Sequence, residues 1–151
     1  MKDTNLWMDS SDFSLTGKRK ISKRSLDWSF KNNSPGRRFM VLMDGSLKIV
    51  GLWGPYAPKL HDGAWLELYR KELESDYEGA VIVADNHFSV GRKFKKIKFY
   101  VPHSKNELIY ASKKQFNKDC RRIRQIIEDP FGIVKSTFKN LDKPFSKYII
   151  Y

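Results

Sequence analysis

The sequence contains a single cysteine, Cys120, and this scarcity limits how the chain can be stabilised. One thiol cannot form an intramolecular disulfide, so the fold has to depend on a hydrophobic core in a reducing compartment. The neighbours of Cys120 at helical spacing, Phe116, Ile123 and Ile127, are apolar. This spacing predicts that the thiol is buried like a small hydrophobic side chain.

Long hydrophobic runs and a secretory leader are also missing. No stretch approaches the roughly 18 apolar residues that a membrane-spanning helix needs, and the start of the chain, MKDTNLWMDSS, lacks the basic-then-apolar pattern of a signal peptide. We therefore expect no membrane partner and no secretion, with a nuclear location in a eukaryote and a cytoplasmic one otherwise. His61 and His87 have no partner at zinc-ligand spacing on a shared helix, so zinc is not expected.

Acidic residues are outnumbered by basic ones. The chain has 29 Lys and Arg against 17 Asp and Glu, and its formal net charge is +12. Basic side chains that neutralise phosphates release condensed counterions, so this excess favours a polyanionic partner, nucleic acid first. Charge alone would also suit a ribosomal protein or an anionic membrane surface. The function therefore has to be inferred from a site.

Basic residues are concentrated in three regions. The segment 17–38, rich in basic and turn residues, predicts a long loop. A lysine-rich segment and a helix later in the chain add further cations, and together these side chains are expected to hold a DNA backbone without reading its sequence. They are Lys18, Arg19, Lys20, Lys23, Arg24, Arg37, Arg38, Lys93, Lys95, Lys96, Lys98, Arg121 and Arg124.

Three strands are predicted in the first third of the chain, at residues 5–13, 38–43 and 46–53. Asp44-Gly45 between the second and the third strand is a strong hairpin signal. The segment 63–76 then has apolar residues at helical spacing, and the short β-branched run 79–85 predicts a buried strand.

The remaining elements are an edge strand and a long helix. Residues 95–101 alternate between apolar and charged positions, as expected for a half-exposed edge strand. The helix is predicted to open at Ser112, with Gln115 completing a capping box, and to carry an apolar stripe. Pro130 lacks an amide donor, so we expect this helix to kink or stop near Glu128.

This order of elements predicts an α/β domain of the RNase H-like fold, with a mixed five-stranded sheet flanked by helices, spanning residues 1–151. In that fold the first and fourth strands are neighbours, about 4.8 Å apart. Asp9 and Asp85 would then meet at the strand ends, where ligands bind in open α/β sheets.

Each candidate also has a purely structural interpretation. Asp9 could be a turn or cap residue, and Asp12 competes with it for a catalytic role. Asp85 could cap the segment that follows it through the amide of His87 or Phe88. Glu128 could simply pair with an arginine one helical turn earlier.

Four stretches in order, MDSSDF, GPYAPKLHDG, VIVADNHF and RRIRQIIEDPFGIVK, resemble the catalytic core of DDE transposases, nearest the Harbinger-like group and its bacterial relatives. The resemblance implies that Asp9, Asp85 and Glu128 are the catalytic residues and the metal ligands. His61 and Asp62 match a recurrent motif of the group with no assigned role.

The resemblance spans about residues 6–140 and implies a specific chemistry. Two Mg²⁺ or Mn²⁺ ions held by the three carboxylates would cleave DNA phosphodiesters and then transfer the freed strand end. The upstream helix-turn-helix of relatives is expected to be absent, so DNA targeting would fall to a partner protein or another copy of the chain. The alternatives are an inactive transposon-derived DNA-binding protein and an unrelated basic RNA-binding protein.

Overall fold

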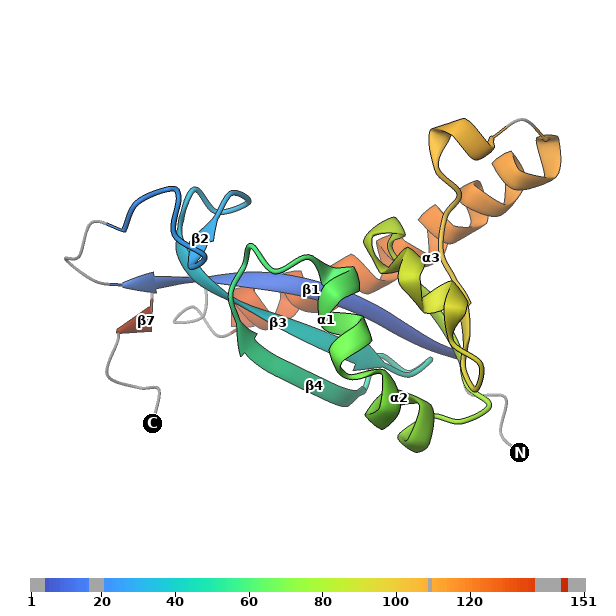
Figure 1. Cartoon of the computed structure of the whole chain (residues 1–151), viewed down its shortest axis with the longest axis horizontal. Coiled ribbons are helices and arrows are strands. Elements are labelled where there is room, and N and C mark those ends of the chain that lie inside the picture. The colour runs from blue at the N-terminus through green and yellow to red at the C-terminus, as the bar shows by residue number, and fades with distance from the viewer. Residues whose placement is uncertain (1–4, 17–20, 109, 138–144, 147–151) are drawn as a thin grey trace.

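The computed structural model describes residues 5–16, 21–108, 110–137 and 145–146, and of residues 16, 124, 126–137 and 145–146 it describes the backbone only. Figure 1 shows strands with helices packed around them. In chain order the elements are β1 (Asn5–Thr16), β2 (Trp28–Ser29), β3 (Ser34–Met43), β4 (Ile49–Tyr56), α1 (Asp62–Leu68), α2 (Arg70–Asp76), β5 (Val81–Ala84), the 3₁₀ helix η1 (Asn86–Lys93), β6 (Lys98–Tyr100), the 3₁₀ helix η2 (Lys105–Glu107), α3 (Ala111–Thr137) and β7 (Phe145–Ser146).

The central strand of the sheet is β1. It pairs antiparallel with β3 on one side and parallel with β5 on the other, and β5 pairs parallel with β6. β4 pairs antiparallel with β3, while the two-residue strands β2 and β7 add to β3 and β1. The predicted mixed sheet of five principal strands with flanking helices, the RNase H-like arrangement, is therefore confirmed.

The turn between β3 and β4 forms where the sequence predicts it. The Asp44 carboxylate accepts hydrogen bonds from the amides of Ser46 (2.9 Å) and Lys48 (3.1 Å), so one side chain holds the turn. The hydrogen bonds to Ser46 and Lys48 outweigh burial and lower the pKa of Asp44, which keeps the carboxylate ionised.

The larger core lies between the sheet and the α1–α2 helices, which are drawn in front of the sheet in Figure 1. Alternate residues of β1 and β3 point toward these helices. Trp65, Leu66 and Leu73 supply the helical side of this core and are at most 1 % exposed. The predicted helix 63–76 is divided into two at Tyr69, and its apolar face is buried as its spacing indicates.

The opposite face of the sheet packs against α3. Val41 and Met43 of β3 form a second, smaller buried cluster that contacts Trp7 of β1 and Ile123 of α3. Cys120 is 5 % exposed, so the prediction of a buried thiol is confirmed.

Three boundary predictions were wrong. The segment 17–38 is not a continuous loop, because β2 lies within it and β3 begins at Ser34, where Gly36 pairs with Ser14 of β1. Ser112 does not open the last helix: α3 begins at Ala111, and the capping box is formed instead by Ser104 and Glu107 at η2. Nor does α3 stop near Glu128, which was one of the two outcomes expected from Pro130; the other, a kink there, stays a prediction. The helix continues through Pro130 to Thr137, because a proline removes one amide donor and leaves the hydrogen bonds of the other turns in place.

Among the described residues, no helix is long and apolar enough to cross a membrane.

Leu66 and Leu68 provide a matched test of this core. Leu66 is fully buried and Leu68, on the same helix, is 73 % exposed. We expect Leu66→Ala to lower the free energy of unfolding by about 2–5 kcal/mol through lost burial and a residual cavity, and Leu68→Ala to change it by less than about 0.5 kcal/mol. Urea denaturation of both variants measures the difference, and equal losses would contradict the packing described.

Candidate active site

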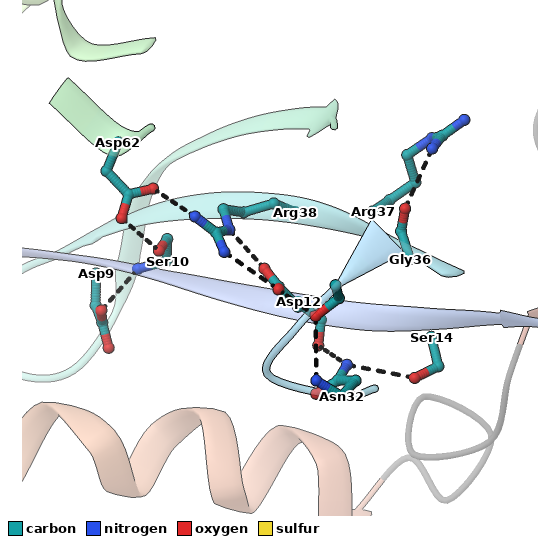
Figure 2. Close-up of polar contacts among 10 residues, drawn as sticks. Asp9, Ser10, Asp12, Ser14, Asn32, Gly36, Arg37, Arg38 and Asp62 are labelled. Atoms are coloured by element: carbon teal, nitrogen blue, oxygen red, sulfur yellow. Dashed lines mark hydrogen bonds and ion pairs between the residues drawn. The ribbon is translucent and has the colours of Figure 1, made fainter. Parts of the chain in front are cut away.

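Two carboxylates lie on neighbouring segments of the sheet, at the point where β5 ends. The parallel register of β1 and β5 places Met8 opposite Ala84, so the residues that come next are Asp9, within β1, and Asp85, directly after β5. Met8 and Ala84 belong to the core on the α1 side. Because side chains alternate along a strand, Asp9 and Asp85 project from the other face, which α3 covers. Figure 2 shows Asp9 pointing toward that helix.

Both carboxylates are oriented by backbone amides. The amide of Ser10 donates to Oδ1 of Asp9 (2.8 Å), and the amide of His87 donates to Oδ1 of Asp85 (3.3 Å). Asp85 is thus the cap residue of η1, as one of the two interpretations predicts. The capping hydrogen bond also fixes the orientation of the Asp85 carboxylate, so this structural role is compatible with a role in a functional site.

Asp9 and Asp85 line one cavity of about 200 Å³. Its second wall consists of His103 and Lys105, from the segment between β6 and α3, together with Arg121 of α3. The cavity therefore has two acidic side chains on the strand side and two cationic side chains on the helix side.

The second wall is fixed to α3 by Asn117. Its side-chain Oδ1 accepts from the amide of His103 (2.7 Å) and its Nδ2 donates to the carbonyl of His103 (2.9 Å). The hydrogen bonds that Ser104 donates to Glu107 outweigh burial and lower the pKa of Glu107, so this carboxylate stays ionised and pairs with Arg92 (3.6 Å).

The donor set fits a hard divalent cation. Carboxylate oxygens are the ligands that Mg²⁺ prefers, and Mg²⁺ completes its shell with water and substrate phosphate. Among the described side chains, no three His, Cys, Asp or Glu residues come together as a metal-binding group. Of the three ligands predicted, Asp9 and Asp85 line the cavity, and Glu128 lies on α3 where only the backbone is described.

On the other face of β1, Arg38 joins two further carboxylates (Figure 2). Its Nε and Nη2 donate to Oδ1 (2.5 Å) and Oδ2 (3.2 Å) of Asp12, and its Nη1 donates to Oδ1 of Asp62 (3.1 Å). Ser29 donates to Asp12 as well (2.6 Å). The Asp12 side chain is 1 % exposed and turned away from the cavity, so its competing candidacy for the catalytic role has no geometric support.

Burial and the charges of Asp12 and Asp62 shift the pKa values of Arg38 and Tyr56. Burial lowers the pKa of Arg38, but its hydrogen bond to Asp12 and the charges of both carboxylates outweigh that effect and raise it, so the guanidinium stays charged. Burial, and then the Asp62 carboxylate, raise the pKa of Tyr56. All three guanidinium nitrogens of Arg38 donate to carboxylates. We therefore assign Arg38 a structural role instead of the DNA contact expected from the sequence.

The other residues predicted to contact DNA fall into three groups: one is paired with a carboxylate, several are not described, and the rest are exposed. Arg37 forms an ion pair with Asp27. Lys18, Arg19 and Lys20 lie outside the described residues, and the side chain of Arg124 is not described. The cations that are exposed are Lys23, Arg24, Lys93, Lys95, Lys96, Lys98 and Arg121.

Sequence reasoning missed His103, Lys105 and Asn117 as residues of the site. The Ser104–Glu107 capping box was a usable signal, because S-x-x-E marks the start of a helical turn. That signal would have predicted an ordered turn here. It would not have shown that the turn faces Asp85, because this depends on how α3 packs.

The structure therefore combines a mixed RNase H-like sheet with two carboxylates, Asp9 and Asp85, that line one cavity. The chain matches the family described as DDE superfamily endonuclease over residues 8–150, and it belongs to that family. Membership indicates a transposase-type nuclease with a DNA substrate, and endonucleases of this superfamily generally use divalent metal ions. Comparison with curated proteins and with solved structures gives no significant match.

The pair of Asp12 and Arg38 should contribute strongly to stability. Asp12→Ala leaves Arg38 with Asp62 as its remaining carboxylate partner and removes the acceptor of the Ser29 hydroxyl, so it should lower the free energy of unfolding by about 1.5–3 kcal/mol. Asp27→Ala is the control, because the ion pair of Asp27 with Arg37 is more exposed and such pairs contribute about 0–1 kcal/mol. Comparable losses in urea denaturation would show that Asp12 is not held as described.

Cys120 is one of the residues that line the cavity, and the reactivity of its thiol measures how well it is buried. Burial, and then the neighbouring charge of Asp119, raise the pKa of its thiol, so less of the reactive thiolate is present at pH 8 than for an ordinary cysteine. We expect the native protein to react with Ellman's reagent much more slowly than the urea-unfolded protein, and faster as the pH rises. Equal rates in the two states would contradict the burial of Cys120.

Proposed function

We propose that this chain is the metal-dependent DNA-cleaving and strand-transfer core of a transposase. The observation that carries the proposal is the adjacency of Asp9 and Asp85, which the β1–β5 register places at the wall of one cavity. The family match supports DNA as the substrate and phosphodiester cleavage as the reaction. The likeness to the Harbinger-like group stays a prediction.

Asp9, Asp85 and Glu128 would hold two Mg²⁺ or Mn²⁺ ions. Glu128 is seven residues beyond Arg121 on α3, which is about two helical turns, so the two positions share one stripe of the helix. Divalent ions held there would supply positive charge to stabilise the attacking and the leaving oxygen of the displaced phosphate.

The cationic wall would hold the substrate. Lys105 and Arg121 line the same cavity as the carboxylates, so they would bind the phosphate that is to be cleaved and fix its orientation. A water molecule would attack this phosphate and break its bond to the 3′-oxygen, which leaves as a free 3′-hydroxyl. That 3′-hydroxyl would then attack a phosphodiester of target DNA, form a new phosphodiester and release the 3′-oxygen of the target strand.

Exposed cations away from the cavity would hold the rest of the DNA. Lys93 ends η1, Lys95 and Lys96 lie between η1 and β6, and Lys98 begins β6. Contacts of this kind position a duplex and carry no sequence information. A separate DNA-binding partner, or a second copy of the chain, would then select the site.

Asp85→Asn separates the proposed activity from DNA binding. The variant keeps an oxygen for the amide of His87 and loses the charge that binds metal, so its Mn²⁺-dependent nicking of supercoiled DNA should fall by more than about 100-fold. Its thermal unfolding should stay unchanged. Asp76→Asn, an equivalent change at an exposed position in the last turn of α2, should nick like wild type.

The outcomes distinguish the candidate functions. Equal nicking by wild type and Asp85→Asn would refute the proposed site. Absence of nicking in both, with DNA binding that weakens steeply as salt increases, would favour an inactive DNA-binding protein.

A further inference from the structure

We propose that His61 and Asp62, at the start of α1, are positioning residues that set the geometry of the Asp9–Asp85 carboxylate pair. The inference rests on the proposed function, because it concerns how that site is held. Each of the two residues reaches one of the carboxylates through a single intermediate residue.

The contact on the β1 side runs through Ser10. Ser10 donates its hydroxyl to Oδ2 of Asp62 (3.4 Å) and its amide to Oδ1 of Asp9 (2.8 Å), as Figure 2 shows. One residue therefore connects the N-terminal end of α1 with the first carboxylate. Asp62 lies on the α1 side of the sheet and Asp9 on the α3 side, so Asp62 acts through the backbone and does not enter the cavity.

The contact on the β5 side runs through His87. The rings of His61 and His87 lie edge to face with their centroids 5.7 Å apart. The amide of His87 donates to Oδ1 of Asp85 (3.3 Å). The His61 ring thus contacts the residue that orients the second carboxylate.

The start of α1 has little freedom to move. Arg38 holds Asp62 and Asp12 at once, which ties α1 to β1 and β3. Gly63 lies so close to η1 that a Cβ there would be 3.4 Å from the carbonyl oxygen of His87. His61 also caps α1, since its Nδ1 accepts from the amide of Gly63 (3.1 Å). A shift of this turn would therefore change the positions of Ser10 and His87 together.

Such a link matters because metal affinity depends on ligand geometry. Residues that orient metal ligands typically change affinity by about 10–100-fold when they are mutated. Placing both contacts on two consecutive residues couples the orientation of one carboxylate to that of the other. This gives His61 and Asp62 a role that neither helix capping nor core packing requires.

Ser10→Ala tests the β1 contact, with Ser14→Ala as the matched control. Ser14 lies on the same strand and face, but its hydroxyl contacts Ser34 (2.8 Å), away from the carboxylates. Isothermal titration calorimetry with Mn²⁺ should give a Kd about tenfold higher for Ser10→Ala than for wild type. Ser14→Ala should match wild type, while both variants lose similar stability in urea. Ser10→Thr restores a hydroxyl and should return the Kd toward the wild-type value.

His61 provides the corresponding pair for the β5 contact. His61→Asn keeps an acceptor for the cap and loses the ring, so it should weaken Mn²⁺ binding. His61→Phe keeps the ring against His87 and should bind Mn²⁺ more tightly than His61→Asn does.

Two results would overturn the inference and leave the proposed function standing. One is an unchanged Kd in Ser10→Ala and His61→Asn while Asp85→Asn loses binding. The other is an equal rise in Kd for Ser10→Ala and Ser14→Ala, which would indicate general loosening of β1. If wild type itself does not bind Mn²⁺, the proposed function falls, and the inference falls with it.

Discussion

The parallel pairing of β1 with β5 is the constraint on which the site depends. It joins segments more than 70 residues apart in the sequence, and its register brings Asp9 level with Asp85. Both strands are anchored by Met8, Ile82 and Ala84, which are buried against α1 and α2. The burial that stabilises the sheet is therefore also what fixes the two carboxylates, because a strand cannot shift without moving its apolar side chains out of the core.

The acidic side chains on the two faces of the sheet have different surroundings. On the α1 side, Asp12 and Asp62 are buried and satisfied by Arg38, an arrangement that specifies geometry. On the α3 side, Asp9 and Asp85 face a cavity whose other wall includes Lys105 and Arg121. A protein with a formal charge of +12 can attract DNA over its surface and still present acidic oxygens at one place, because the acidic groups lie in a recess.

Much of this arrangement could be predicted from the sequence, because it follows from local patterns. Alternation identified β6, the Asp44-Gly45 turn identified the β3–β4 hairpin, and element order placed Asp9 beside Asp85. The errors have non-local causes. β3 begins at Ser34 because β1 offers pairing partners there, and α3 passes Pro130 because one lost hydrogen bond does not end a helix. The partner of Arg38 could not be predicted, since Asp12 and Asp62 meet only after the sheet and α1 pack.

Successive side chains of β1 point to opposite faces of the sheet: Met8 and Ser10 face α1, while Asp9 faces α3. Residues that pack on the α1 side therefore alternate along this strand with residues that face the cavity. Over evolutionary time such a strand tolerates replacement of its side chains far better than a change in its length. Inserting or deleting one residue before Asp9 would turn the carboxylate into the apolar core and a methionine into the cavity. Related chains should therefore keep the length of β1 constant and take up their insertions in the turns, such as the one that joins β3 to β4.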